Sequence, residues 1–188
     1  MSDLSRFPLP GVDALPEDLR ARVAELEERM GFVPNLFRVM AYRPEELRLF
    51  MAYHDALMDK ETGLTKAERE MIVVATSAAN QCLYCCVSHG AFLRIRSKNP
   101  RLGDQVAVNY REAEIDDRQR AMLDYAVRLA ERPWTVTDGD LEGLRAHGFG
   151  DVDIWDIGAI TALFAMSNRL ASHTGMPPNP EFYGMARE

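Results

Sequence analysis

The spacing of helix-starting and helix-ending residues constrains the fold of this chain more than any other feature. Proline, threonine or aspartate precedes most apolar stretches with helical periodicity, and glycine or proline follows them. No segment shows the alternation of apolar and polar residues that is typical of a half-buried strand. The sequence therefore predicts an all-α protein, with helices over 19–30, 34–40, 44–62, 65–79, 116–132, 137–147 and 151–170.

The predicted helix that begins at Asp151 is apolar over most of its circumference. Such a helix is either buried at the centre of a domain or shared with a second subunit, so we expect a homo-oligomer. With 188 residues, 47% of them hydrophobic, the chain can bury one substantial core. We predict a single helical domain over 1–188, with an N-terminal helical extension over 1–60 and a cysteine-bearing core over 61–175. The proline-rich segment 176–183 is expected to be an extended arm.

The charge balance limits the classes of partner. The net charge is −7 and the isoelectric point is near 5.2, and the basic residues between Arg94 and Arg101 form only a short cluster. This argues against binding to nucleic acid. The N-terminus does not resemble a secretion signal, and no apolar run is long enough to span a membrane. We therefore expect a soluble, cytoplasmic protein without membrane contacts.

All three cysteines fall within five residues, in the segment Cys82-Leu-Tyr-Cys85-Cys86. On one helix, Cys82, Cys85 and His89 would share a face because they are three and four residues apart. A reactive thiol needs a lowered pKa, which an imidazole or a helix N-terminus can provide. Asn80 interrupts the apolar pattern, so a helix that starts near Cys82 would supply such an N-terminus. The cluster predicts a thiol redox site.

Glu70 is a further candidate, although it lies twelve residues before Cys82. It can reach the dithiol only if the chain bends near Asn80, and the alternative is a charge on a solvent-facing helix surface. A zinc site would need further ligands, since Cys82, Cys85 and His89 supply three and no second ligand pair appears. Inert packing of the cysteines is the remaining alternative. We expect no metal and no bound cofactor.

The remaining histidines and the tryptophans are assigned no chemistry. His54 is expected to be a core or interface residue, and His147 is expected to interact with the dipole at a helix end. His173 is also expected near a helix terminus. Trp134 and Trp155 are expected in the core or at an interface.

Several motifs together resemble those of a known family. These are Glu70, Cys82-x-Tyr84-Cys85 and His89, the upstream segment Gly31-Phe-Val-Pro-Asn-Leu-Phe, and the closing segment 164–180. The chain resembles the alkylhydroperoxidase AhpD-like family, the peroxidase-related branch of the carboxymuconolactone decarboxylase superfamily. The resemblance implies an all-helical bundle that assembles as a homodimer, trimer or hexamer. It also implies a thiol-dependent peroxidase with a role in antioxidant defence.

The same resemblance implies roles for four residues. Cys85 would attack the peroxide, and Cys82 would resolve the product by closing a Cys82–Cys85 disulfide. His89 would assist proton transfer at Cys85, and Glu70 would act through a relay toward Cys82. The thiol chemistry is consistent with these roles, because a sulfenic acid condenses with a neighbouring thiol to form a disulfide.

The chain departs from the family pattern at two positions. Tyr84 stands where the best-known member has a histidine, so a phenol replaces an imidazole. Cys86 is an additional thiol, which could compete in resolution or could simply pack. The expected substrate is a small hydroperoxide, and the expected electron donor is an external dithiol such as a lipoyl-bearing protein. A general thiol–disulfide oxidoreductase and a non-enzymatic redox sensor or assembly protein remain alternatives. A decarboxylase is a weaker alternative, because that chemistry does not require a dithiol.

Overall fold

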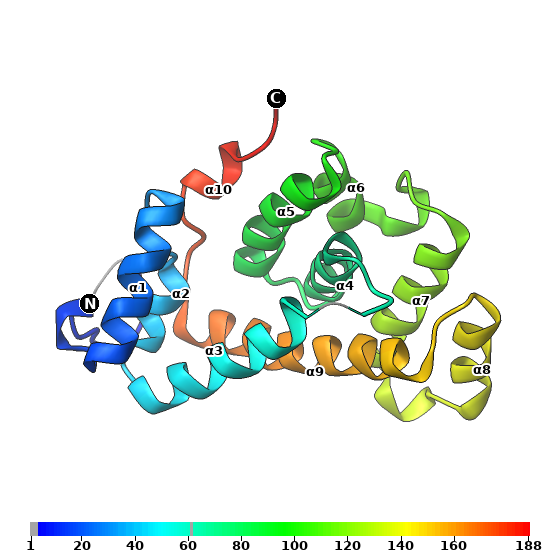
Figure 1. The fold of residues 1–188 in the computed structure, drawn as a ribbon, viewed down its shortest axis with the longest axis horizontal. Helices are drawn as coiled ribbons and strands as arrows, with labels where there is room; N and C mark the ends of the chain where they lie inside the picture. The colour runs from blue at the N-terminus through cyan, green and yellow to red at the C-terminus, as the bar shows by residue number, and fades with distance from the viewer. Residues whose placement is uncertain (1–3, 61) are drawn as a thin grey trace.

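The computed structural model describes residues 4–60 and 62–188, and these residues form helices connected by short loops (Figure 1). No β-strand occurs among them, which confirms the all-α prediction. The predicted boundary between the extension and the core falls at residue 61, outside the described residues. In chain order the helices are η1 Val12–Ala14, α1 Glu17–Met30, α2 Asn35–Met40, α3 Pro44–Met58, α4 Lys66–Ala79, α5 Leu83–Ser97, α6 Leu102–Asn109, η2 Tyr110–Glu112, α7 Asp117–Glu131, η3 Pro133–Thr135, α8 Asp138–Ala146, α9 Asp151–Thr174 and α10 Glu181–Gly184.

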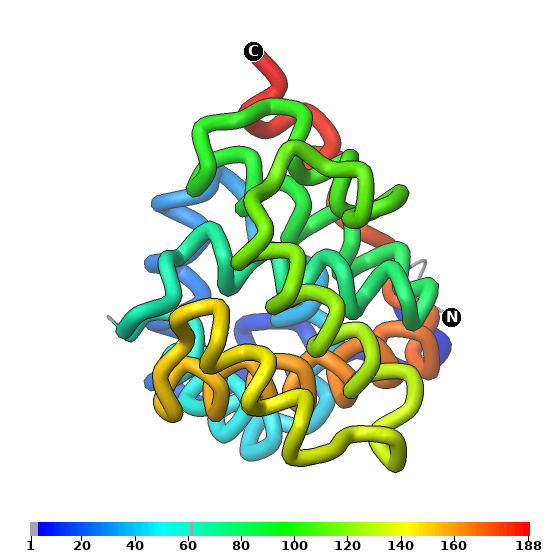
Figure 2. The backbone as a smooth tube through the Cα atoms, turned by 90° about the vertical axis from the view of Figure 1, so that its right-hand side faces the viewer, coloured from blue at the N-terminus to red at the C-terminus, as the bar shows by residue number. Residues whose placement is uncertain are grey.

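Helix α4 lies at the centre of the molecule and packs against α5, α6, α7 and α9 (Figures 1 and 2). Its residues from Glu68 to Ser77 are all buried, because neighbouring helices surround it. The predicted capping box at its start is present: the Thr65 hydroxyl accepts from the Glu68 backbone, and the Glu68 carboxylate accepts from the Thr65 backbone. This cap fixes where α4 begins, and therefore which residues it presents to α5.

Helix α9 runs along one side of the molecule, and α1, α2 and α3 form a lobe beside its C-terminal half (Figure 1). After α9 ends at Gly175, in a left-handed conformation, the chain passes between α2 and α5 and finishes in α10. The side chain of Asn179 fastens this arm to the lobe: its amide donates to the Val33 carbonyl at 3.0 Å, and its carbonyl accepts from the Asn35 backbone at 2.7 Å. The arm thus closes the space between the lobe and the core.

Helices α5 and α6 approach each other closely at two glycines. A Cβ atom added at Gly103 would lie 2.5 Å from the Gly90 carbonyl oxygen. A larger residue at this position would force the two backbones apart, so the glycine permits the crossing.

The structure differs from the predicted helices in three places. The helix that begins at Pro44 ends at Met58, before Gly63. Gly63 itself packs against α9 so closely that an added Cβ would collide with the Asp153 carboxylate. The sequence did not predict α6, which is short and has no side-chain cap at Arg101. The C-terminal arm is extended through its prolines, as predicted, but it then forms the short helix α10 with Phe182 buried.

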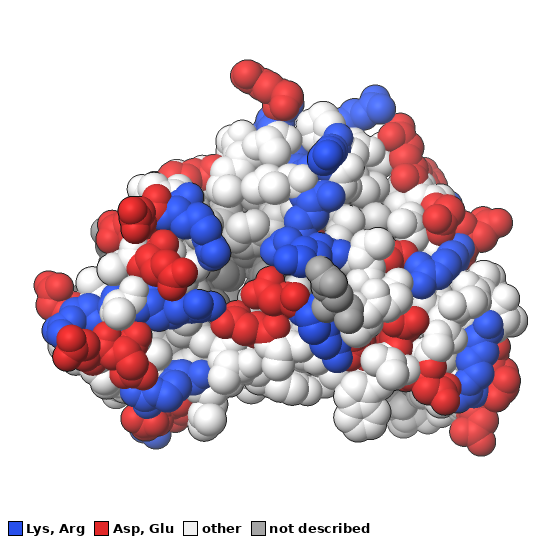
Figure 3. Space-filling view, in the orientation of Figure 1, with Lys and Arg blue, Asp and Glu red and all other residues white. Residues whose placement is uncertain are grey.

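The surface mixes charges of both signs: on the face shown in Figure 3, a file of lysine and arginine side chains runs down the centre and adjoins acidic side chains. None of the helices in the described parts of the chain is long and apolar enough to cross a bilayer. Trp134 and Trp155 are 78% and 75% exposed, so the expectation that they lie in the core is wrong for the single chain. Their expected place at an interface stays a prediction.

Candidate functional site

The two cysteines of the CxxC motif lie at a sharp bend between α4 and α5. Helix α4 ends at Ala79, Gln81 adopts a left-handed conformation with φ of 54°, and Cys82 is the N-cap residue of α5. The bend near Asn80 that Glu70 needs in order to reach the dithiol is therefore present, and so is the predicted helix start near Cys82. Because α5 turns back along α4, residues far apart in the sequence meet across the two helices.

The dithiol is reduced and buried. Cys82 is 2% exposed and Cys85 is 1% exposed, and all three cysteines are free thiols. The two side chains pack in a small apolar cluster with Val39 of α2, Ala171 of α9 and Met176 of the C-terminal arm. The dithiol therefore contacts the core, the lobe and the arm.

The local environment makes the two thiols unequal. The Cys85 thiol, as a hydrogen-bond partner, lowers the pKa of Cys82 to about 7, and the first-turn backbone N–H groups of α5 add to this against the opposing effect of burial. The same partnership, together with burial, raises the pKa of Cys85 well above its ordinary value. The first proton of the pair is therefore lost from Cys82, and Cys85 stays protonated.

A polar network on α9 supports the dithiol. The Ser167 hydroxyl lies 3.8 Å from the Cys85 sulfur. Asn168 donates from Nδ2 to the Ser77 hydroxyl at 2.9 Å and accepts at Oδ1 from the Asn80 amide at 3.0 Å. Asn168 also contributes to the lowered pKa of Cys82. The sequence analysis missed Ser167 and Asn168, although two adjacent polar residues in the largely apolar stretch 157–171 were an available signal.

Glu70 lies in the interior, where it meets His89 across the bend. Its side chain is 4% exposed, its Oε2 atom lies 2.7 Å from His89 Nδ1, and its Oε1 atom accepts from Arg96 Nε at 3.2 Å. The solvent-facing alternative for Glu70 is thus excluded. The sequence predicted neither Arg96 nor the direct pairing of Glu70 with His89, and the roles of both residues stay predictions.

Tyr84 and Cys86 occupy different environments. The buried Tyr84 phenol oxygen accepts from the Leu36 N–H at 3.1 Å, which ties α5 to α2, and burial raises the pKa of Tyr84. Cys86 is half-buried, and burial raises the pKa of its thiol to about 12. Cys86 is therefore not a ready thiolate near neutral pH.

A cavity of about 520 Å³ lies between the N-terminal lobe and α5. Its lining includes Glu70, Tyr84, Ser88 and His89, so it reaches the residues next to the dithiol. His54 also lines it, and the His54 and His89 rings lie 6.2 and 4.7 Å from the Phe164 ring. The volume and the largely apolar wall are typical of a small-molecule site.

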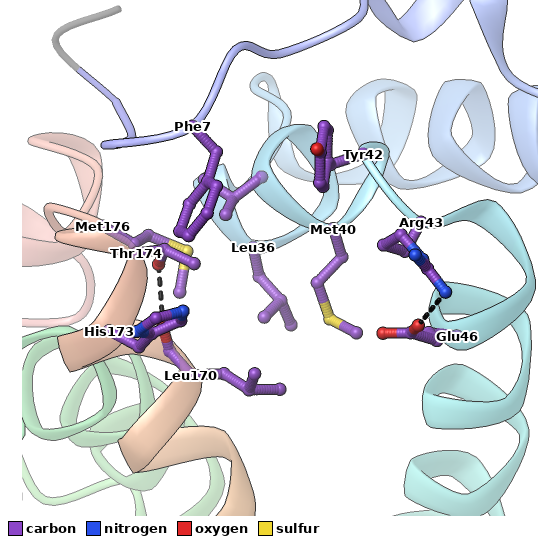
Figure 4. Close-up of a pocket in the computed structure, with 11 residues that line it drawn as sticks. Phe7, Leu36, Met40, Tyr42, Arg43, Glu46, Leu170, His173, Thr174 and Met176 are labelled. Atoms are coloured by element: carbon purple, nitrogen blue, oxygen red, sulfur yellow. Dashed lines mark hydrogen bonds and ion pairs between the residues drawn. The ribbon is translucent and has the colours of Figure 1, made fainter.

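A second cavity of about 290 Å³ lies on the other side of α2 and is open to solvent (Figure 4). Side chains from the N-terminal segment, α2, α9 and the arm point into it: Phe7, Leu36, Met40, Leu170 and Met176. Val39, Met176 and Leu36 also pack in or against the cysteine cluster, so this cavity adjoins the dithiol from a second direction.

The other residues considered in the sequence lie outside this arrangement. His147 follows α8, with Nδ1 2.8 Å from the Gly143 carbonyl, and His173 lies in the last turn of α9 with its ring 5.2 Å from that of Phe7. In the described parts of the chain, no three histidine, cysteine, aspartate or glutamate side chains are grouped as metal ligands would be.

Fold and site together define an all-helical protein with a buried dithiol at the start of a central helix. The carboxymuconolactone decarboxylase family matches residues 44–131, which include the dithiol. The chain belongs to the AhpD-like branch of this family. No curated protein matches the chain at a significant level.

Solved structures show the same fold over the whole chain. A peroxidase-related protein from Ralstonia eutropha JMP134, described as an alkylhydroperoxidase AhpD core, is 58% identical, with a TM-score of 0.97 over 100% of this chain and 99% of that one. A peroxidase-related protein from Silicibacter sp. TM1040 is 42% identical, with a TM-score of 0.93 over 99% and 97%. The debrominase Bmp8, which is 18% identical, shares the fold with a TM-score of 0.78 over 99% and 97%.

Proposed function

We propose that this protein is a thiol peroxidase that reduces organic hydroperoxides through Cys82 and Cys85. The observation that carries the proposal is the buried dithiol at the N-terminus of α5, in which one thiol has a pKa of about 7. Such a thiol is about half ionised at pH 7, and its thiolate can take the proton of Cys85, so the pair supplies the thiolate that attacks peroxides. The description of two relatives as peroxidase-related supports the same activity.

The proposed cycle begins with a proton transfer within the pair. Cys85 passes its proton to the Cys82 thiolate and then attacks the terminal oxygen of the hydroperoxide. The O–O bond breaks, the alkoxide takes a proton from His89 and leaves as an alcohol, and Cys85 becomes a sulfenic acid. The Cys82 sulfur then attacks the Cys85 sulfur, the S–O bond breaks, and hydroxide leaves as water with the Cys82 proton.

An external dithiol would complete the cycle. It reduces the Cys82–Cys85 disulfide by thiol–disulfide exchange, which restores both protein thiols and converts the donor to its own disulfide. The burial of both cysteines favours a slender donor, such as a dihydrolipoyl group, over the surface of a bulky protein. No cofactor is required to stay bound between turnovers.

His89 is proposed as the proton donor, and Glu70 as the residue that positions it. His89 follows Cys85 by one helical turn, so the two side chains share a face of α5. Glu70 holds the Nδ1 side of the ring, which leaves Nε2 for the proton transfer. Arg96 keeps the Glu70 carboxylate in place from the other side.

The test is steady-state reduction of cumene hydroperoxide with dihydrolipoamide as donor, for the wild type and three serine variants. Cys82→Ser and Cys85→Ser should each lose turnover, whereas Cys86→Ser should keep it. After treatment with peroxide, the Cys82→Ser variant should hold a sulfenic acid at Cys85 that dimedone traps. A trapped sulfenic acid in Cys85→Ser instead would reverse the two roles.

Two other results would replace the proposal. Faster reduction of disulfides than of hydroperoxides by the wild type would indicate a general thiol–disulfide oxidoreductase. A dithiol that peroxide oxidises once, and that no dithiol donor reduces, would indicate a redox sensor.

We also propose that the working form is a homo-oligomer. Three large apolar side chains lie exposed along one stripe of α9, at a spacing that suits helix pairing: Val152, Trp155 and Met166. A second copy of the same chain could cover this stripe by pairing its own α9 with it. Light scattering coupled to size-exclusion chromatography measures the mass directly, and a monomer at all concentrations would contradict this proposal.

A further inference from the structure

The charged residues that line the 520 Å³ cavity are paired with one exception. Arg22 Nη2 lies 2.6 Å from Asp55 Oδ2, and Arg96 pairs with Glu70. Both of these acidic side chains are therefore already neutralised by a neighbouring arginine.

The third acidic residue of the lining, Asp59, has Lys66 Nζ at 3.9 Å. Among the described residues, the structure gives Arg29 no hydrogen bond, ion pair or ring contact with any other side chain. The charge of Arg29 interacts electrostatically with Asp55, but Asp55 already pairs with Arg22, so two arginines of the lining share one carboxylate and one positive charge is in excess there.

The rest of the wall suits an apolar chain. Much of the lining consists of methionine and phenylalanine side chains, which adapt to flexible ligands: Met30, Phe50, Met51, Phe92, Phe182 and Met185. Arg29 lies on α1, whereas His89 and Tyr84 lie on α5, and all three side chains line the same cavity. A ligand that fills the cavity would therefore meet both a cation and the residues beside the dithiol.

We infer that the preferred substrate is an amphipathic hydroperoxide: an apolar chain that carries the peroxide group and ends in a carboxylate bound by Arg29. Fatty-acid hydroperoxides have this chemistry. The inference rests on the proposed peroxidase function, because it concerns the substrate of the same dithiol. It adds a specificity residue outside the reacting groups, in the N-terminal lobe.

The experiment compares linoleic acid hydroperoxide with its methyl ester, both below their micellar concentrations. The rate of thiol loss is measured in single turnovers by quenched flow, for the wild type, Arg29→Gln and Arg29→Lys. The matched control is Arg38→Gln, which removes an exposed arginine from α2 that does not line the cavity. The wild type should prefer the acid, and Arg29→Gln should reduce the ratio of acid to ester rates by about fivefold, as expected for one exposed charge pair.

Arg29→Lys should restore most of the preference, Arg38→Gln should leave the ratio at the wild-type value, and added salt should reduce the ratio. In steady state, Arg29→Gln should raise the KM for the acid and leave kcat unchanged. Equal wild-type rates for acid and ester, or equal effects of Arg29→Gln and Arg38→Gln, would overturn the inference while leaving the peroxidase function intact. Failure of both hydroperoxides to oxidise the dithiol would instead refute the proposed function.

Discussion

Removing the Cys85 thiol should raise the pKa of Cys82, because that thiol is the largest cause of its acidity. In the wild type the pKa falls from an ordinary value of 9.0 to about 7, a shift of two units. At about 1.4 kcal/mol per unit, the folded environment stabilises the Cys82 thiolate by about 3 kcal/mol. In Cys85→Ala, the hydrogen-bond donor is lost while burial, which opposes ionisation, remains. The pKa of Cys82 should therefore rise by at least one unit.

The assay is the ultraviolet absorbance of the thiolate as a function of pH. The wild type should show one thiolate forming with a midpoint near 7, and Cys86→Ala should keep this midpoint because the Cys86 thiol ionises only at about 12. The midpoint of Cys85→Ala should lie above 8. A wild-type midpoint in the ordinary thiol range of about 8.5, or an unchanged midpoint in Cys85→Ala, would refute the argument.

The same pKa shifts predict how stability depends on pH. Cys82 has a lower pKa folded than unfolded, so between pH 7 and about 8.5 the unfolded chain binds more protons and the free energy of unfolding rises with pH. Cys85 has a higher pKa in the folded chain than in the unfolded chain. Above about pH 8.5 the folded chain therefore binds more protons, and the free energy of unfolding falls with pH. The contribution of this pair to the free energy of unfolding, measured by urea denaturation, should therefore be largest near pH 8.5 to 9. In Cys82→Ser, the free energy of unfolding should no longer rise between pH 7 and about 8.5.

Three further changes test other parts of the structure. Glu70→Gln should lower the rate of peroxide reduction by about a hundredfold, because His89 loses the partner that orients it, while the Cys82 midpoint stays near 7. Gly103→Ala should lower the free energy of unfolding by about 1–3 kcal/mol in urea denaturation, because the added Cβ would lie 2.5 Å from the Gly90 carbonyl oxygen. Trp155→Glu should reduce the mass measured by light scattering, since it places a charge in the apolar stripe of α9.

The glycine change and the tryptophan change each have a matched control. Gly143→Ala adds a methyl group in open space within α8 and should not destabilise the protein. Trp134→Glu changes a tryptophan that is similarly exposed but lies outside α9, so the mass should not fall. If Gly103→Ala were as stable as Gly143→Ala, or if the two tryptophan variants behaved alike, the corresponding structural argument would be wrong. A fully active Glu70→Gln would remove Glu70 from the site.

The sequence predicted those parts of the structure that depend on local chemistry. The Thr65–Glu68 capping box and the helix ends at Gly31 and Gly175 involve residues only a few positions apart. The bend before Cys82 was also predictable, because Asn80 breaks the apolar pattern that precedes it.

The parts that escaped prediction depend on contacts between distant segments. The Arg96–Glu70 pair joins residues 26 positions apart, and the Asn168–Ser77 hydrogen bond joins residues 91 positions apart. Spacing along one helix cannot reveal such contacts, because they arise from how α5 and α9 pack on α4. The same reason explains why neither cavity was predicted, since each is lined by several helices.

The most direct test of the account is a single turnover with one equivalent of cumene hydroperoxide, analysed by mass spectrometry of the protein and chromatography of the product. The account predicts one equivalent of cumyl alcohol, loss of two protein thiols, and a disulfide between Cys82 and Cys85 with Cys86 still free. Alcohol formation without this disulfide, or a disulfide that includes Cys86, would contradict the proposed dithiol cycle.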